Sequence, residues 1–184
     1  MRYVALLRGI NVGGNTMIKM QELRAMFEAL GFENVLSYIN SGNIAFDHGQ
    51  KSASSKGSRS TEFSLVSKIE AALEKNFGKR VLAMVREQEQ VPKIIAANPY
   101  DGEYASHKEM HVLFLKEELP DEKMAELRSI APANERFTVI GREIYCHLPM
   151  GVAESLMGRG QFEKKLNISV TARNWRTVAK LAVL

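Results

Sequence analysis

The chain has 184 residues, of which 45% are hydrophobic and 25% are charged, and its formal net charge is +4. This composition is ordinary for a soluble globular protein of one large or two small domains, and the single cysteine, Cys146, excludes an internal disulfide framework. No apolar run approaches the roughly 20 residues of a membrane span, and the run before Arg8 is too short for a secretory signal, so we expect a cytoplasmic protein without a membrane partner.

The spacing of apolar residues predicts the same order of elements twice. In the first half, strands are expected at residues 3–7, 35–39, 44–46 and 81–85, with helices near 20–30, 65–77 and 91–95. In the second half, strands are expected at residues 110–115, 137–140, 144–148 and 168–171, with helices near 120–130, 156–166 and 175–182. Each half is thus β-α-β-β-α-β plus an extra helix, the order of a split βαβ unit. We predict an α+β fold of duplicated ferredoxin-like units with extra helices, at residues 1–97 and 108–184.

Two segments depart from this repeat, and a third is expected to be flexible. Residues 8–19 connect the first strand to the first helix, whereas the corresponding connection in the second half covers only about residues 116–119. Long ordered loops in compact domains tend to be functional. Gly158 and Gly160 interrupt a helical pattern, which predicts a break or a special loop at residues 157–161. Residues 48–61 are rich in Ser, Lys and Gly and are expected to form a mobile, dispensable insertion.

The Gly-rich segment after the first strand resembles a phosphate-binding P-loop. That motif needs a lysine where Asn15 stands and a helix that begins at once, and here the helix is expected only near Met20, which disfavours an NTPase. Because Gly has no Cβ, the loop could still bind an anion through its backbone N–H groups. The alternative is a loop that only packs against and caps its own fold.

Positive charge is concentrated in residues 158–184, which contain six basic residues and one acidic residue. Arg173 and Asn174 are expected at the start of the last helix, where a guanidinium beside unpaired N–H groups suits a carboxylate or phosphate. Alternatively, Arg173 pairs with a local acid and Thr171 caps the helix. The same segment with Trp175 could bind single-stranded nucleic acid, although core packing is the more usual role of such a residue.

Other reactive side chains give no sign of a metal or catalytic centre. His107 and His111 have the spacing of a helical zinc pair, but Lys108 stands where a metalloprotease needs Glu, so we expect no metal site. Cys146 and His147 lie in an alternating strand pattern and are expected to be packed residues. No nucleophile–base pair is identifiable, so the sequence leaves open whether the protein is an enzyme and whether it uses a cofactor.

Four blocks of the sequence together resemble a known family: residues 3–14, Lys19-Met20 with Leu23, residues 38–43 and residues 171–178. They are similar to the bacterial domain-of-unknown-function family numbered 1697, over essentially the full length. The resemblance implies a duplicated ferredoxin-like fold in a cytosolic protein, and it implies no established activity, substrate or cofactor. Family members often have Lys after the glycine pair, where this chain has Asn15, and the insertion after Phe46 is longer here than is usual.

The sequence therefore predicts a cytoplasmic protein that binds a small anionic or phosphate-bearing ligand. We expect one wall of the site from the 8–19 loop, a contribution from the adjacent hairpin, and completion by the start of the last helix. The candidate ligand-binding residues are Arg8, Asn11, Gly13, Gly14, Asn15, Ser41, Asn43, Arg173 and Asn174. Two alternatives remain open: a single-stranded nucleic-acid-binding module that uses the basic C-terminal segment, and an oligomeric interaction protein without catalysis.

Overall fold

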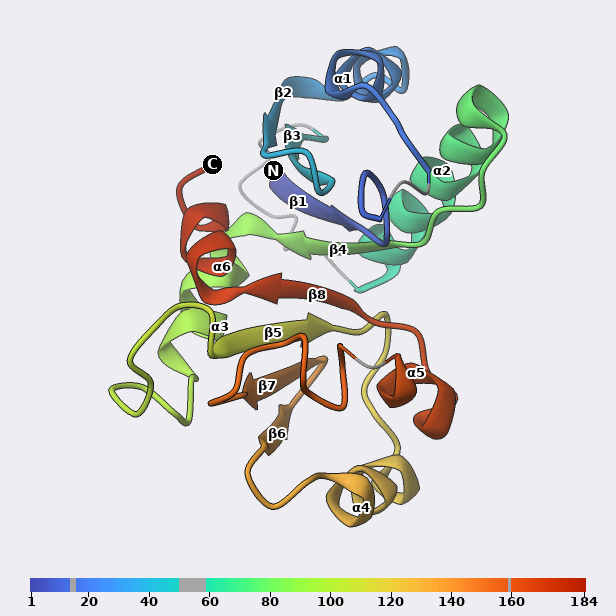
Figure 1. Ribbon diagram of the computed structural model, residues 1–184. Helices are drawn as coiled ribbons and strands as arrows, with labels where there is room; N and C mark the ends of the chain where they lie inside the picture. The colour runs from blue at the N-terminus through green and yellow to red at the C-terminus, as the bar shows by residue number, and fades with distance from the viewer. Residues whose placement is uncertain (14–15, 50–58, 159) are drawn as a thin grey trace. The chain divides into compact units, whose positions relative to one another are not determined.

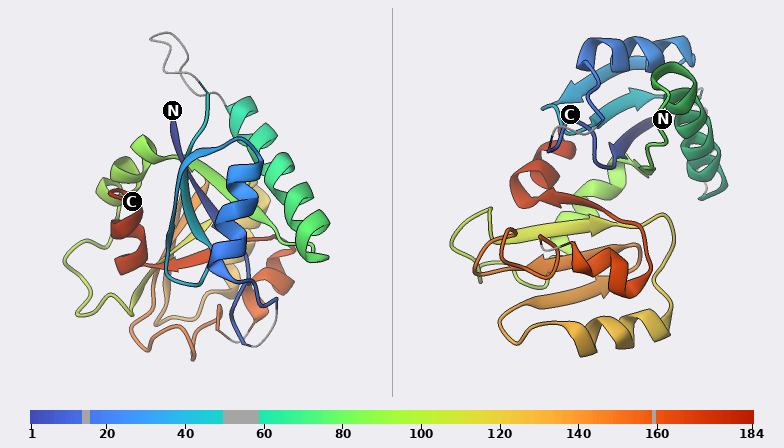
Figure 2. Two further views of the ribbon diagram at one scale, coloured as in Figure 1. Left: turned by 90° about the horizontal axis from the view of Figure 1, so that it is seen from above. Right: turned by 45° about the vertical axis from the view of Figure 1, so that its right-hand side comes forward.

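The computed structural model describes residues 1–13, 16–49, 59–158 and 160–184 (Figures 1 and 2). The chain divides into two compact units, the first formed by Met1–Val91 with Leu181–Leu184 and the second by Pro92–Lys180. Each unit contains a four-stranded antiparallel sheet, so the protein has a mixed α+β fold. Residues 92–97, which we expected in the first subdomain, lie in the second unit.

The first unit contains the sheet β2-β3-β1-β4. Its elements are β1 (Arg2–Leu7), α1 (Met20–Ala29), β2 (Glu33–Tyr38), β3 (Asn43–Asp47), α2 (Arg59–Phe77), β4 (Ala83–Glu87) and the 3-10 turn η1 (Gln88–Gln90). Alternate residues of the strands face α1 and α2, and Figure 1 shows both helices on one side of this sheet. Leu23 and Phe27 of α1 meet Ile69 and Leu73 of α2 in this core, together with Phe46 of β3.

The second unit contains a sheet with the matching order β6-β7-β5-β8. Its elements are α3 (Val91–Ala96), β5 (Met110–Phe114), α4 (Asp121–Ile130), β6 (Arg136–Ile140), β7 (Glu143–His147), α5 (Gln161–Leu166), β8 (Thr171–Asn174) and α6 (Trp175–Leu181), of which α3 begins and α6 ends on a residue of the first unit. The order of strands and helices predicted from the sequence is confirmed. Only the position of the last strand differs: we expected it at residues 168–171, whereas β8 begins to pair with β5 at Thr171.

One face of the second sheet forms a core with helices of the same unit. Ile144 and Cys146 point into a core with Leu127 of α4 and Phe162 of α5, and Cys146 is fully buried, as the sequence predicts for a packed thiol. Tyr145 points the opposite way, and its hydroxyl donates a hydrogen bond of 2.7 Å to the carbonyl oxygen of Ile94 in α3. Burial raises the pKa of this phenol, so it stays protonated as a donor.

The segments that depart from the repeat do so as the sequence indicates. In the first unit β1 ends at Leu7 and α1 begins only at Met20, whereas in the second β5 ends at Phe114 and α4 begins at Asp121. A Cβ at Gly158 would lie 1.9 Å from the carbonyl oxygen of Val152, so a tightly wound loop precedes α5. We expected a mobile insertion at residues 48–61, and its predicted C-terminal boundary was wrong, because α2 already begins at Arg59. Residues 50–58 lie outside the described residues.

Candidate functional site

The loop between β1 and α1 is held in shape by the side chain of Asn11. Its Nδ2 donates hydrogen bonds of 2.9 Å to the carbonyl oxygens of Ile18 and Asn40, and its Oδ1 accepts one of 2.8 Å from the N–H of Ile18. The backbone N–H of Asn11 also donates to the carbonyl oxygen of Thr16, at 3.1 Å. One amide thus closes the loop and ties it to the β2–β3 hairpin, so Asn11 shapes this region from within.

Left-handed backbone conformations of non-glycine residues gather in this loop and hairpin. Asn11 has φ 54°, Thr16 has φ 47° and Ile39 has φ 48°. Asn tolerates this conformation, but the branched side chains of Thr and Ile oppose it. Such strain persists only where the surrounding structure imposes it, and it tends to gather at functional sites. The strained residues therefore mark this end of the first unit as the place to look for a site.

The hairpin and the loop are also locked together by close packing. A Cβ at Gly42 would lie 2.7 Å from Cβ of Leu7 and 2.9 Å from Cδ1 of Ile10, and Gly42 has φ +76°. Both side chains that it meets are fully buried. The carbonyl oxygen of Gly42 accepts a hydrogen bond of 2.8 Å from the N–H of Leu7. Only glycine satisfies both the backbone angle and the close approach at this position.

A pocket of about 430 Å³ opens between the loop, the hairpin and the start of α1. Its described lining consists of Asn11, Met17, Ile18, Lys19, Met20, Glu22 and Asn40. Lys19 occupies the N-cap position of α1 and its side chain makes no capping hydrogen bond. The first turn of α1 therefore has no side-chain cap at the edge of the pocket. Lys19 Nζ instead forms an exposed ion pair of 3.2 Å with Glu22.

Of the predicted site residues that the structure describes, only Asn11 lines this pocket. Arg8 is exposed and its backbone N–H donates to the carbonyl oxygen of Leu82, while Gly13 is exposed with φ 61°. Asn43 is fully buried, and its Nδ2 donates to the carbonyl oxygen of Tyr38 and to Oγ of Ser41, both at 3.1 Å. Gly14 and Asn15 lie outside the described residues. Sequence reasoning missed the other lining residues, because their positions depend on how the loop folds.

Arg173 and Asn174 lie in the second unit, and each makes hydrogen bonds to its own segment of the chain. We expected Arg173 at the start of the last helix, but it belongs to β8. Its side chain is 6% exposed, and its NH1 donates hydrogen bonds of 2.8 Å to Thr171 Oγ1 and to the carbonyl oxygen of Ala172. Burial lowers the pKa of its guanidinium to about 10. Asn174 Oδ1 accepts a hydrogen bond of 2.9 Å from the N–H of Thr177, so Asn174, not Thr171, caps α6.

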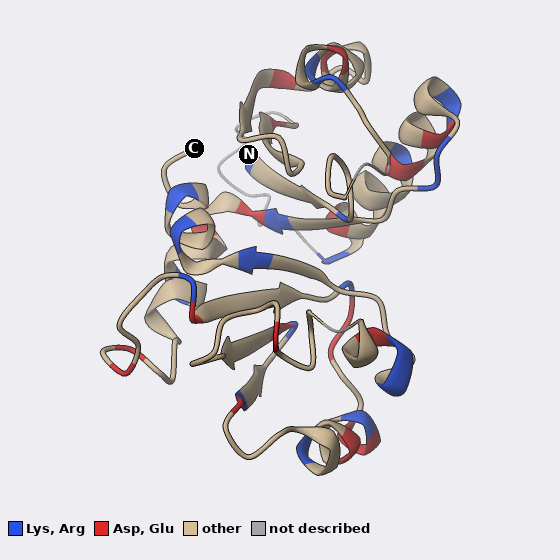
Figure 3. Ribbon diagram, viewed as in Figure 1, with Lys and Arg blue, Asp and Glu red and all other residues tan. Residues whose placement is uncertain are grey.

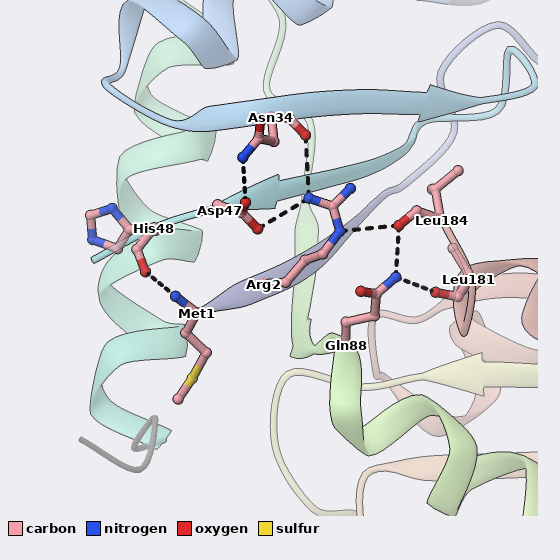
Figure 4. A network of polar contacts seen from close by, with 8 residues as sticks. All are labelled: Met1, Arg2, Asn34, Asp47, His48, Gln88, Leu181 and Leu184. Carbon is pink, nitrogen blue, oxygen red and sulfur yellow. Dashed lines mark hydrogen bonds and ion pairs between the residues drawn. The ribbon is translucent and has the colours of Figure 1, made fainter. Parts of the chain in front are cut away.

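A second pocket of about 780 Å³ lies at the other end of the first sheet, beside a network centred on Arg2 (Figure 4). Arg2 NH1 contacts Asp47 Oδ1 at 3.1 Å, and Asn34 Nδ2 donates to Asp47 Oδ2 at 2.7 Å. Burial alone would raise the pKa of Asp47, but the hydrogen bonds from Asn34 and Arg2 and the charge of Arg2 hold it below its usual value. Arg2 Nε and Gln88 Nε2 also donate to the carbonyl oxygen of Leu184, at 3.0 and 2.9 Å.

The histidines that were considered as a zinc pair from their spacing differ in burial. His107 is exposed, whereas His111 is 8% exposed on β5, and burial lowers the pKa of His111 to about 4. His147 is packed, as expected, and its Nδ1 faces the Arg136 guanidinium at 2.6 Å. Among the described residues, His, Cys, Asp and Glu side chains form no group of three that could hold a metal ion.

Within the described ranges, every helix is too short or too polar to cross a bilayer. Figure 3 shows basic residues on α5 and α6, the charge that the sequence places near the C-terminus.

Comparison with known proteins identifies the family. A solved structure of the conserved bacterial protein SP0830 from Streptococcus pneumoniae is similar to this chain, with 25% identity and a TM-score of 0.73. The similarity covers 98% of this chain and 96% of that one. No curated protein matches the chain. The family model described as "Protein of unknown function (DUF1697)" matches residues 1–145, and the chain therefore belongs to the DUF1697 family, as its sequence blocks indicated.

Proposed function

We propose that the first unit binds a small anionic ligand in the pocket between the 8–19 loop and α1. The observation that carries this proposal is the pocket itself, about 430 Å³ in volume and built by a loop far longer than its counterpart in the second unit. A volume of this size is typical of sites for small molecules. A structural loop could connect β1 to α1 without forming such a pocket, as the short connection from β5 to α4 illustrates.

The charge at the start of α1 favours an anion. The first N–H groups of a helix lack intrahelical partners, and the helix dipole adds partial positive charge there. No side chain caps α1 from the Lys19 position. The ion pair between Lys19 and Glu22 joins side chains that are 83% and 54% exposed, so it is worth little and Lys19 can turn to an anion. Glu22 opposes binding, and its repulsion limits the affinity for a small, highly charged ion.

The loop is prepared for binding by its own hydrogen bonds. Asn11 joins Ile18 to Asn40, so two walls of the pocket are fixed before any ligand arrives. A site fixed in advance loses less conformational entropy on binding. Ile39, next to Asn40, has a strained left-handed φ, and strain of this kind tends to occur at functional sites.

We further infer that each unit is a ferredoxin-like, split βαβ unit. The support is the sheet order, in which β3 lies between β1 and β2 in the first unit and β7 lies between β5 and β6 in the second. The two helices that follow the first and third strands of each unit contribute to one core, which fits the same arrangement.

A nucleic-acid-binding module is the weaker alternative. Lys164 and Lys165 of α5 are exposed and basic, but Trp175 is only 7% exposed and packs edge-on against Tyr104 at 6.3 Å. A buried indole cannot stack on a base. The described lining of the pocket near α1 contains a lysine and a glutamate but no nucleophile beside a general base. We therefore propose binding and derive no reaction.

The proposal is tested by titrating inorganic phosphate into isotopically labelled protein and following the amide resonances. We expect saturable shifts of Lys19, Met20 and Glu22, with a Kd on the order of 1–10 mM for so small an ion. The Lys19→Met variant should bind several-fold more weakly. The matched control is Lys123→Met, because Lys123 forms the same i,i+3 pair with Glu126 on α4, at 2.8 Å. Equal effects of the two variants, or shifts confined to other residues, would refute the proposal.

A further inference from the structure

The lining of the pocket near α1 is largely apolar, which an inorganic ion does not require. Ile18 and Met20 line it, and Met17 lies at its edge with 72% of its surface exposed. An exposed methionine is a flexible, adaptable apolar side chain, suited to close over a ligand. Met150 of the second unit is similarly exposed, at 70%, but unlike Met17 it does not line this pocket.

The side chain of Asn11 is committed to the protein itself. Asn11 spends both Nδ2 protons on carbonyl oxygens, one of which belongs to Asn40, and its Oδ1 on the N–H of Ile18. Lys19 and the start of α1 can contact a charged group. Met17, Ile18 and Met20 offer apolar contact area in place of hydrogen bonds.

We propose that the ligand of this pocket is an organic anion that carries an apolar group, such as a ring or a short acyl chain, beside its charge. This inference rests on the proposed anion site. The charged group lies at Lys19 and the start of α1, and the apolar group packs against Met17, Ile18 and Met20. The volume of about 430 Å³ supports a ligand larger than an inorganic ion, because sites of about 300–1,000 Å³ take drug-sized molecules and an inorganic phosphate fills little of such a space.

The test compares inorganic phosphate, phenyl phosphate, benzoate and phenol by the same resonance titration. We expect phenyl phosphate to bind about tenfold more tightly than phosphate, which corresponds to 1.4 kcal/mol. Met17→Gln, which keeps the length of the side chain but makes it polar, should weaken the binding of phenyl phosphate more than that of phosphate and so remove most of that advantage. Met150→Gln is the matched control and should change neither. Benzoate tells whether the charged group must be a phosphate or can be a carboxylate, and tighter binding of either aromatic anion than of inorganic phosphate supports the inference.

The outcomes separate this inference from the proposal on which it rests. Equal affinities for phosphate and phenyl phosphate, with benzoate no tighter, overturn the apolar group and leave the anion site standing. Equal losses for both phosphates in Met17→Gln do the same. Phenol that binds as tightly as phenyl phosphate overturns the anion site itself, as does the absence of saturable binding by any of the four probes.

Discussion

Replacing Asn11 tests whether one side chain holds the shape of the 8–19 loop. Asn11→Ala removes the hydrogen bonds to Ile18 and Asn40, three in all. At about 0.5–1.5 kcal/mol each, their loss costs the loop about 1.5–4.5 kcal/mol. The left-handed φ of 54° adds about 1 kcal/mol, because alanine opposes this conformation and asparagine tolerates it. Asn11→Gly should lose the hydrogen bonds without the backbone cost.

The effect is local, so amide hydrogen exchange measures it better than global unfolding. The N–H of Ile18 donates to Asn11 Oδ1, and in Asn11→Ala its exchange should accelerate by about a hundredfold, equivalent to about 2.8 kcal/mol. Asn167→Ala is the matched control, because Asn167 also has a left-handed backbone, with φ 49°, but the structure gives its side chain no hydrogen bond among the described residues. If Asn11→Ala destabilises its loop no more than Asn167→Ala destabilises the end of α5, the loop is held by something other than this amide.

Three further predictions concern stability, measured by chemical unfolding. Gly42→Ala should cost about 3 kcal/mol, whereas Gly102→Ala, with the same φ of +76° and open space around it, should cost about 1 kcal/mol; equal costs would show that close packing plays no part. Asp47→Asn should lower the free energy of unfolding by about 1 kcal/mol at pH 7. Because the folded protein lowers the pKa of Asp47 below 3.8, the stabilising carboxylate is lost as the pH falls through the folded pKa, and the difference between the two proteins should vanish there. A difference that persists in acid contradicts this. The pKa of His111 falls from 6.5 in the unfolded chain to about 4 in the folded protein, so the unfolded chain binds the proton first as the pH falls. The free energy of unfolding should therefore decline by up to about 3 kcal/mol from pH 7 to pH 4. His111→Phe should make this decline smaller, and an unchanged decline would refute the reasoning.

The sequence predicts the order of elements because each strand and helix displays its own periodicity. Leu23, Phe27 and Leu73 recur at helical spacing, and the same residues form the core. The position of β8 was wrong because apolar Ile168 and Val170 suggested a strand, whereas the pairing is decided by backbone hydrogen bonds to β5 that a polar Thr-Ala-Arg-Asn segment makes equally well.

The candidate site was only partly predictable. The unusual length of the 8–19 loop directed attention to the region that contains the pocket near α1, and Asn11 was among the residues named. Its role was not foreseeable, because its partners Ile18 and Asn40 meet it only once the loop has folded over the hairpin. Met17 gave no signal at all: a single methionine in a polar segment has no periodicity, and its place at the pocket is a tertiary property.

The discontinuous make-up of the first unit has a consequence for its folding during synthesis. The buried residues of its core cluster all precede Val91, so this core can form while the ribosome is still translating the second unit. Residues 181–184 also belong to the first unit, but they are made after every residue of the second. Arg2 and Gln88 therefore cannot form their hydrogen bonds to Leu184 until residues 92–184 have been synthesised. The nascent first unit therefore passes through a form in which its core is complete but residues 181–184 are still missing. Formation of the core and addition of these residues are separated by the time needed to translate about half of the protein.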